Sequence, residues 1–283
     1  MQLTPSMLRI DPEVTQQKIT RFIKDYAEKA KTRGIALGVS GGVDSATTAA
    51  LCTKAIGANK VLCLYMPEEE TYNKTDHKHV TFLARKFKFQ LKTIDLTQPL
   101  KTLYKAIPDY DQADRLSRGN LKARTRMLVW YYYANRQNRI VAASGDKSET
   151  MIGYYTKWGD AAADIAPIMD LYKTQVQQLA LHLGIPLAIA KKTPTPALWP
   201  NQTAEEEIGL KYETLDLILH GLEHFMDTKR IAEQLSMPAK TVTAIKKRWL
   251  STEHKRKMPL TTKLAYRTVN HDFRLNRTTE LGE

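Results

Sequence analysis

A short stretch near the N-terminus combines two glycines with hydroxyl and carboxylate side chains. The residues Ser40-Gly41-Gly42-Val43-Asp44-Ser45 follow the apolar run 35–39 and precede the small-residue segment 46–56, an order that indicates a strand, a tight turn and a helix. Backbone N–H groups beside glycine approach an anion closely, and a helix N-terminus attracts negative charge. A carboxylate next to a phosphate is repulsive unless a cation lies between them. The pattern therefore predicts a phosphate-binding loop with a Mg²⁺ ligand at Asp44.

The alternative for this stretch is a glycine turn that only caps a helix, because Asp and Ser are good caps. The stretch 40–45 lacks the lysine of the Gly-x-x-x-x-Gly-Lys loop, and it does not match the Gly-x-Gly-x-x-Gly fingerprint. All six residues in a strand–turn–helix context nevertheless favour phosphate binding. Glu149 follows the apolar segment 139–143 and is expected at the same edge of the sheet, so with Asp44 it predicts a two-carboxylate Mg²⁺ site. A first-turn glutamate favoured by the helix dipole is the alternative for Glu149.

The remaining elements must bring these two segments together. Apolar runs predict buried strands at 35–39, 61–65, 90–94 and 139–143, and helical periodicity separates them. The predicted helices cover residues 11–31, 46–56, 74–88 and 118–136. Strands that alternate with helices of this length favour an α/β fold with a doubly wound parallel sheet. A helix near 173–183, the Pro-rich stretch 193–200 and three further helical segments predict a helical C-terminal elaboration. The basic tail 252–283 has no clear periodicity.

Composition limits the function classes. Hydrophobic residues make up 42% and charged residues 26% of the chain, which is ordinary for a globular protein. The chain contains no run of about 18 apolar residues, so no membrane span is expected. The N-terminus has no signal-peptide layout, and we therefore expect a cytoplasmic protein. Cys52 and Cys63 lie in apolar segments and are expected to be buried free thiols. The net charge of +13 indicates an anionic ligand or surface.

Several longer motifs carry a resemblance to a known family. The six-residue loop is similar to that of the ATP pyrophosphatases, and the other segments resemble signatures of NAD synthetases. These segments are 119–127, 144–149, 153–160, 163–167, 171–175, 194–195, 198–202 and 254–256. The resemblance covers roughly residues 34–258. It implies a single synthetase domain over 1–283, with a core at about 12–250, the tail 252–283 and no glutaminase domain.

The resemblance also implies which residues bind and react. ATP is assigned to Gly38, Val39, the loop 40–45, Ser144, Lys173 and Thr195, and Mg²⁺ to Asp44 and Glu149. Deamido-NAD is assigned to Arg124, Lys157, Asp164, His254 and Lys255. The catalytic set is Asp44, Lys173, Thr195 and Asp160, with Asp160 as the candidate for accepting a proton from ammonium. A lysine and a hydroxyl aimed at the α-phosphate suit the charge that develops there, although Lys173 alone also fits a solvated helix charge.

The implied reaction is ATP-dependent amidation of deamido-NAD by ammonia, through an NAD-adenylate, with release of pyrophosphate and AMP. The implied partners are deamido-NAD, ATP and ammonia, with Mg²⁺ as cofactor and a second copy of the chain in a homodimer, and neither nucleic acid nor membrane. Some residues depart from the family pattern: Ser144 replaces the usual Thr, and Ala161, Pro196 and Ala204 change the segments expected near nicotinate and ammonia.

Three alternatives stay open at this point. One is another ATP pyrophosphatase that modifies tRNA, which the positive charge suits but the absence of further cysteines disfavours. Another is a nucleic-acid-binding module, because segment 231–249 resembles a helix-turn-helix with a basic second helix. The third is a decayed site, which the presence of Asp44, Glu149, Lys173 and Thr195 disfavours.

Overall fold

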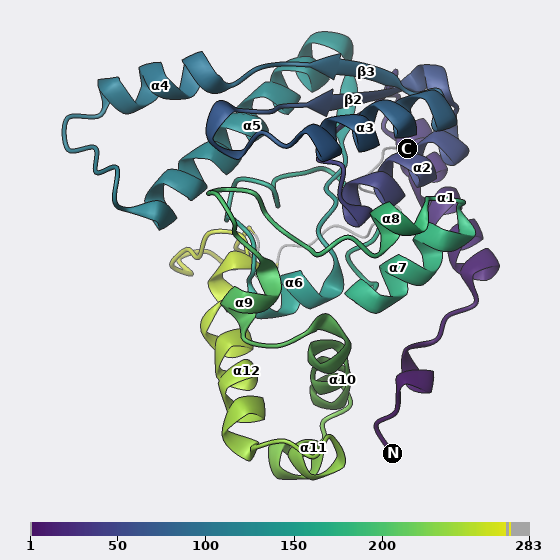
Figure 1. The fold of residues 1–283 in the computed structure, drawn as a ribbon, viewed down its shortest axis with the longest axis vertical. Coiled ribbons are helices and arrows are strands. Elements are labelled where there is room, and N and C mark those ends of the chain that lie inside the picture. Colours follow the sequence, from purple (N-terminus) through teal and green to yellow (C-terminus); the bar gives the residue numbers. More distant parts are fainter. Residues whose placement is uncertain (1, 270–271, 273–283) are drawn as a thin grey trace.

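A four-stranded parallel sheet forms the centre of the fold (Figure 1), in a computed structural model that describes residues 2–269 and 272. The strand order is β3-β2-β1-β4, and every pair is parallel. The strands are β1 (Gly34–Gly38), β2 (Val61–Tyr65), β3 (Gln90–Thr93) and β4 (Arg139–Val141). All four lie within a residue or two of the predicted segments. Long apolar runs predicted them because strands of a covered parallel sheet are buried on both faces.

Alternate residues of β1 and β2 belong to two different hydrophobic clusters. Ile35 and Leu37 pack with residues of α1, α2, α3 and α7, whereas Ala36 packs with Trp130 of α5 and Leu100 of α4. The helices on the first face are α1 (Pro12–Lys29), α2 (Val43–Ile56), α3 (Lys74–Phe87) and α7 (Lys173–His182). The second face is covered by α4 (Thr97–Ala106) and α5 (Arg115–Gln137). Helices on both faces confirm the doubly wound α/β fold.

The sequence analysis missed one helix of this layer. Residues 97–106 form α4, which lies between β3 and α5 and buries Leu100. Its apolar positions are few and its polar residues many, so no helical period was recognised there. Cys52 and Cys63 are free and buried as expected, and burial raises the pKa of Cys52 to about 12.

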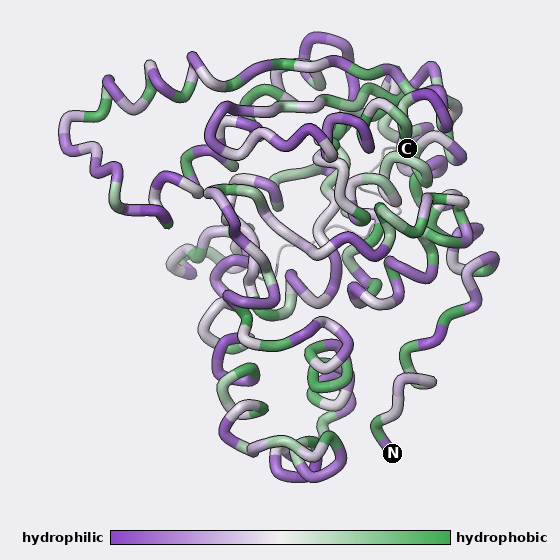
Figure 2. The backbone as a smooth tube through the Cα atoms, viewed as in Figure 1, coloured by the Kyte–Doolittle hydropathy of each residue, from purple (hydrophilic) through white to green (hydrophobic). Residues whose placement is uncertain are grey.

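The C-terminal helices pack mainly against one another, below the α/β layers in Figure 1. They are α9 (Ala204–Ile208), α10 (Tyr212–Glu223), α11 (Thr228–Gln234) and α12 (Ala239–Ser251). The short helix α8 (Leu187–Ala190) instead buries Ile189 and Ala190 in the cluster on the first face of the sheet. Figure 2 shows α10 as largely hydrophobic, in keeping with its central place in this cluster. The helix-turn-helix candidate corresponds to α11 and α12, whose residues Ile231, Val242 and Ile245 are buried in the same cluster. Within the described residues, no helix has the length and apolarity needed to cross a membrane.

A buried carboxylate on α10 joins the C-terminal helices to the α/β layers. Asp216 has no exposed surface, and it accepts hydrogen bonds from the Ser148 hydroxyl at 2.5 Å and the Thr174 amide at 2.9 Å. The Ser148 oxygen in turn accepts from the amide of Lys173 at 2.9 Å. The first amides of a helix have no partner within the helix. Asp216 and Ser148 therefore satisfy the start of α7 and fix it against α6 (Lys147–Ile152).

Replacing Asp216 by alanine is expected to lower the free energy of unfolding by about 1 to 3 kcal/mol, because the Ser148 hydroxyl and the Thr174 amide lose their buried acceptor. Urea unfolding at neutral pH measures this loss. Glu213→Ala, an exposed change on the same helix, is the matched control and should change stability by less than about 0.5 kcal/mol. Equal stability of the two variants would show that Asp216 does not hold α6 and α7 together.

Candidate active site

The site lies where the order of the sheet reverses. The chain leaves β1 toward β2 on one side, while β4 lies on the other side of β1, and ligands of open α/β sheets bind in the crevice at such a point. A cavity of about 720 Å³ opens there. It is lined by most of the predicted ATP-binding positions, namely Gly38, Val39, Ser40, Gly42, Val43, Asp44, Ser45, Ser144 and Thr195, and also by Glu149, Asp160 and Lys255.

The loop after β1 forms the phosphate-binding shape that its sequence predicts. Gly41 has φ +83°, and a Cβ there would lie 2.9 Å from the carbonyl oxygen of Asp76, so only glycine fits this turn. Gly42 is the N-cap of α2, and no side chain caps the helix. The first amides of α2 are therefore available to an anion. Ser45 is buried, and its hydroxyl oxygen accepts from the Ser40 amide at 3.1 Å.

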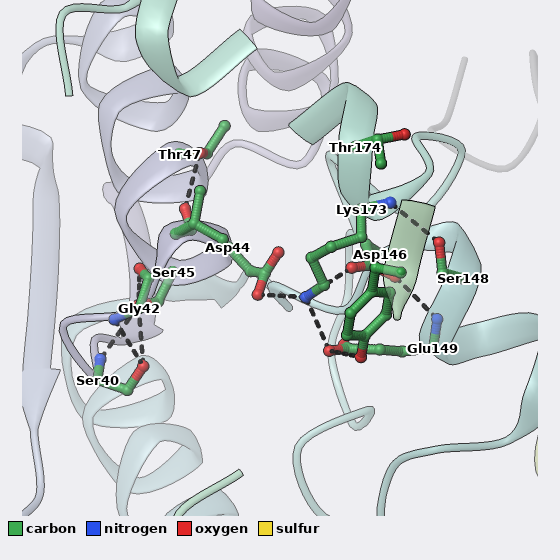
Figure 3. A network of polar contacts seen from close by, with 12 residues as sticks. Ser40, Gly42, Asp44, Ser45, Thr47, Asp146, Ser148, Glu149, Lys173 and Thr174 are labelled. Atoms are coloured by element: carbon green, nitrogen blue, oxygen red, sulfur yellow. Dashed lines mark hydrogen bonds and ion pairs between the residues drawn. The ribbon is translucent and has the colours of Figure 1, made fainter. Parts of the chain in front are cut away.

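Lys173 lies at the centre of an acidic cluster (Figure 3). Its side chain has no exposed surface, and its Nζ lies 2.6 Å from Asp44, 2.7 Å from Asp146 and 2.8 Å from Glu149. Asp44 lies in the first turn of α2, Asp146 is the N-cap of α6 and Glu149 lies in its first turn, and Lys173 begins α7. The structure thus brings three predicted residues together with one that was not assigned a role, Asp146.

The charges of this cluster shift the pKa values of its members. Burial and the charges of Asp146 and Asp44 raise the pKa of Glu149 to about 8, against the opposing effect of Lys173. Burial also raises the pKa of Asp146 to about 6. For Lys173, burial alone favours the neutral amine, but the three carboxylates outweigh it and raise its pKa well above the usual value. The lysine is therefore a permanent cation among acids that compete for protons.

The carboxylates of the cluster suit a Mg²⁺ ion. One oxygen from each of Asp44, Asp146 and Glu149 lies within 4.8 Å of the others. Asp44 Oδ1 is buried without a hydrogen-bond partner among the described residues, although buried polar atoms normally have one. Mg²⁺ prefers oxygen ligands and one or two carboxylates beside substrate phosphates. The donor set and the unpartnered oxygen both fit this ion.

The positions assigned to the dinucleotide are only partly brought together. The Arg124 guanidinium donates to the carbonyl of Lys157 at 3.2 Å, so these two lie side by side. Lys255 lines the cavity and donates to the carbonyls of Gly153 and Tyr155, at 2.7 Å each. Asp164 and His254 are exposed and do not line the cavity. The Asp164 carboxylate accepts from the Val141 amide at 2.6 Å instead.

A second buried lysine, Lys122, connects α5 to two other segments near the cavity. Lys122 is 1% exposed and contacts Glu68 at 2.8 Å and Glu70 at 2.6 Å. It also donates to the carbonyl of Leu198 at 2.9 Å. These contacts tie α5 to the segment that carries Thr195, whose hydroxyl is exposed toward the cavity and accepts from the Ala197 amide at 3.0 Å.

Sequence reasoning assigned no role to Asp146, Asp216, Lys122 or Tyr212. Tyr212 is 2% exposed, and its hydroxyl donates to Glu149 at 3.4 Å. Asp216 interrupts the apolar run Leu215–Leu219, and a lone carboxylate in such a run is a usable signal for a paired buried acid. Asp146 precedes Glu149 by three residues, which is the spacing between an N-cap residue and the amide that it caps. In the structure the Asp146 side chain does accept from the Glu149 amide and caps α6.

An α/β fold with a phosphate loop and an acidic cluster at the switch point of its sheet defines a nucleotide-binding enzyme. Residues 15–259 match the NAD synthase family. An NH(3)-dependent NAD(+) synthetase of Methanosarcina mazei is 40% identical over 250 residues, which cover 88% of this chain and 98% of that protein. The chain belongs to the NAD synthase family and is therefore a ligase that forms a carbon–nitrogen bond.

Solved structures agree with this assignment. An NMN synthetase from Francisella tularensis is similar with a TM-score of 0.80 at 30% identity, covering 90% of this chain and 100% of that chain. An NH3-dependent NAD synthetase from Campylobacter jejuni, in complex with the nitrate ion, has a TM-score of 0.75 at 28% identity, with coverage of 90% and 100%.

The affinity of the acidic cluster for a divalent ion is expected to rise as the pH increases from about 6 to about 8. Protons compete with the metal for Asp146 and Glu149, whose pKa values are raised to about 6 and about 8, and rising pH removes these protons. Mn²⁺ titration followed by electron paramagnetic resonance measures the affinity. Glu149→Gln should weaken binding and flatten the upper part of the profile. An unchanged profile in Glu149→Gln would remove Glu149 from the metal site.

Lys173→Met is expected to lower the free energy of unfolding without metal by about 3 to 5 kcal/mol, because the buried Asp146 and the partly exposed Asp44 and Glu149 lose their cation. Mg²⁺ should restore more stability to this variant than to the wild type, because the ion supplies the missing charge. Chemical denaturation with and without Mg²⁺ tests both points, with exposed Lys18→Met as the control. Wild-type stability of Lys173→Met without Mg²⁺ would contradict the charge balance described for the cluster.

Proposed function

We infer that this chain catalyses the ATP-dependent amidation of deamido-NAD by ammonia to give NAD⁺, AMP and pyrophosphate. The observation that carries this inference is that an uncapped phosphate loop, Asp44 and Glu149 line one cavity, while the buried Lys173 pairs with both carboxylates from behind its wall. Membership of the NAD synthase family supports the choice of substrate. An NH(3)-dependent NAD(+) synthetase is 40% identical over most of the chain, which supports ammonia as the nitrogen donor.

The ATP half of the site is assigned to the loop and the elements that face it. The amides of Gly41 and Gly42 and the free N-terminus of α2 bind phosphate oxygens, and Ser45 and Ser144 add hydroxyls. Asp44 and Glu149 would hold Mg²⁺, with Asp146 available as a third ligand. When bound, Mg²⁺ neutralises phosphate charge and orients the leaving pyrophosphate. The cavity holds these groups rigidly, because the loops after β1 and β4 are fixed by the sheet.

The reaction proceeds in two steps, adenylation of the carboxylate and its amidation by ammonia. An oxygen of the nicotinate carboxylate attacks the α-phosphorus of ATP, and the bond to the β-phosphate oxygen breaks, giving an acyl-adenylate and pyrophosphate. Ammonia then attacks the acyl carbon, AMP leaves, and a proton is lost. Lys173 and Thr195 stabilise the charge that develops on the α-phosphate. Asp160 lines the same cavity and accepts the proton that ammonium must release.

The dinucleotide occupies the part of the cavity near Lys255, and Arg124 and Lys157 bind its pyrophosphate from the rim. Asp164 and His254 are exposed beside this region and complete the set assigned to deamido-NAD. The protein acts in the cytoplasm as a homodimer and uses ammonia directly, with residues 1–283 forming one synthetase domain. The start of the tail is expected to close over the dinucleotide through His254 and Lys255, and residues 270–271 and 273–283 lie outside the described part of the chain.

A substrate panel tests the reaction. Pyrophosphate release with Mg-ATP and ammonium is measured with deamido-NAD, nicotinate mononucleotide, xanthosine monophosphate and aspartate as acceptors. Only deamido-NAD should support release, with NAD⁺ and AMP formed in equal amounts. Asp44→Asn should lower the turnover by at least about 100-fold, because it removes a charged ligand of the Mg²⁺ that neutralises the phosphates, while exposed Lys18→Met should leave the turnover unchanged. Release that does not depend on deamido-NAD would overturn the proposal.

Nicotinate mononucleotide is included because the NMN synthetase from Francisella tularensis has a TM-score of 0.80 with this chain. Preference for the mononucleotide would keep the adenylation chemistry and change the substrate. The two outcomes are separated by kcat/KM for each acceptor at saturating ATP and ammonium.

A further inference from the structure

Two histidines and a glutamate gather at the end of α10, outside the cavity described above. His220, Glu223 and His224 occupy one face of the helix, because residues three and four apart are neighbours. One ligand atom from each lies within 4.8 Å of the others, and the two imidazole rings are 4.2 Å apart between centroids. None of the three lines the catalytic cavity, and no step of the proposed reaction uses them.

Each neutral imidazole keeps one nitrogen lone pair that could bind a metal. Nδ1 of His224 is 2.8 Å from the carbonyl oxygen of His220. A carbonyl only accepts, so this nitrogen is the donor and Nε2 carries the lone pair. Nε2 of His220 is buried and has no hydrogen-bond partner among the described residues. Burial and the neighbouring His224 lower the pKa of His220, which keeps its ring neutral at physiological pH.

Glu223 is oriented by Lys147 and Tyr172. Its Oε1 accepts from Lys147 at 2.6 Å and its Oε2 from the Tyr172 hydroxyl at 2.5 Å. Each carboxylate oxygen retains a second lone pair. Although burial favours the protonated acid, the hydrogen bonds from Lys147 and Tyr172 hold the pKa of Glu223 below its usual range. Outer contacts of this kind fix the direction of a metal ligand.

The local charge also permits a cation. The Lys147 ammonium lies 3.1 Å from Asp170 as well as close to Glu223, so the two carboxylates exceed the one ammonium by a single negative charge. The lowered pKa of His220 means that its imidazole adds no positive charge at physiological pH. Asp170, Glu223 and Lys147 together therefore do not repel a cation that binds mainly to imidazole nitrogen.

We propose that His220, Glu223 and His224 form a Zn²⁺ site separate from the Mg²⁺ site. Imidazole nitrogen favours zinc and similar transition metals, whereas Mg²⁺ prefers oxygen. Two nitrogens and one carboxylate oxygen leave one position of a tetrahedral zinc for water. The ion would lie where α10 meets α6 and α7, because its ligand Glu223 also accepts hydrogen bonds from Lys147 at the start of α6 and from Tyr172 beside the start of α7. The site goes beyond the proposed amidation and does not depend on it.

The test is calorimetric titration of the whole protein with Zn²⁺ while millimolar Mg²⁺ saturates the carboxylate cluster. One Zn²⁺ per chain is expected. His224→Ala, at an exposed position, should weaken binding by at least about tenfold, because loss of a ligand costs no less than loss of an outer contact. His182→Ala is the matched control, since this histidine lies on α7 and pairs with Glu13. It should bind Zn²⁺ as the wild type does.

Two further measurements keep the outcome decisive. Co²⁺ should give the visible absorption of a tetrahedral site in wild type and in His182→Ala, and lose it in His224→Ala and in a second variant, His220→Gln. Zn²⁺ should raise the melting temperature of the wild type but not of His224→Ala. The proposal is overturned by equal Zn²⁺ binding in His224→Ala and wild type, by no binding to the wild type at micromolar Zn²⁺, or by binding that only Glu149→Gln abolishes. The amidation assay plays no part in these readouts, so failure here leaves the proposed reaction untouched.

Discussion

The ammonium group of Lys173 has no exposed surface and lies within hydrogen-bonding distance of Asp44, Asp146 and Glu149. A buried charge is costly unless it is paired and hydrogen-bonded. The loops after β1 and β4 and the start of α7 must therefore stay at fixed distances from one another. Asp216 and Ser148 lie outside the cluster and help to fix these distances, because they bind the first amides of α7 and hold α7 against α6. The carboxylates that pair with Lys173 are also those proposed to hold Mg²⁺.

The topology of the sheet explains why these groups meet. With the order β3-β2-β1-β4, the segments that follow β1 and β4 leave the sheet side by side at its carboxyl edge. The first supplies the phosphate loop and Asp44, and the second supplies Asp146 and Glu149. The C-terminal helices then close the cluster from below, with Tyr212 against Glu149 and Asp216 against α7. The helical elaboration is thus part of the site.

The sequence predicted the strands and the strand–turn–helix shape around residues 40–45 well because both are local. Covered parallel strands appear as apolar runs, and the loop 40–45 is six adjacent residues. The buried supports were not predictable in the same way, since their meaning depends on distant partners. Ser148 and Asp216 are 68 positions apart, and Asp44 and Lys173 are 129 apart. The sequence named Lys173 as a phosphate ligand through resemblance, but nothing local indicated that three carboxylates surround it. Helix α4 was missed because it buries little apolar surface.

Oxygen-isotope tracing tests the central claim, attack of a carboxylate on the α-phosphorus, most directly. Deamido-NAD carrying ¹⁸O in both carboxylate oxygens is converted with Mg-ATP and ammonia, and the products are analysed by mass spectrometry. The account predicts one ¹⁸O atom in AMP and one in the amide of NAD⁺, with none in pyrophosphate. Label in pyrophosphate, or AMP without label while NAD⁺ is formed, would contradict an acyl-adenylate and the role assigned to this cluster.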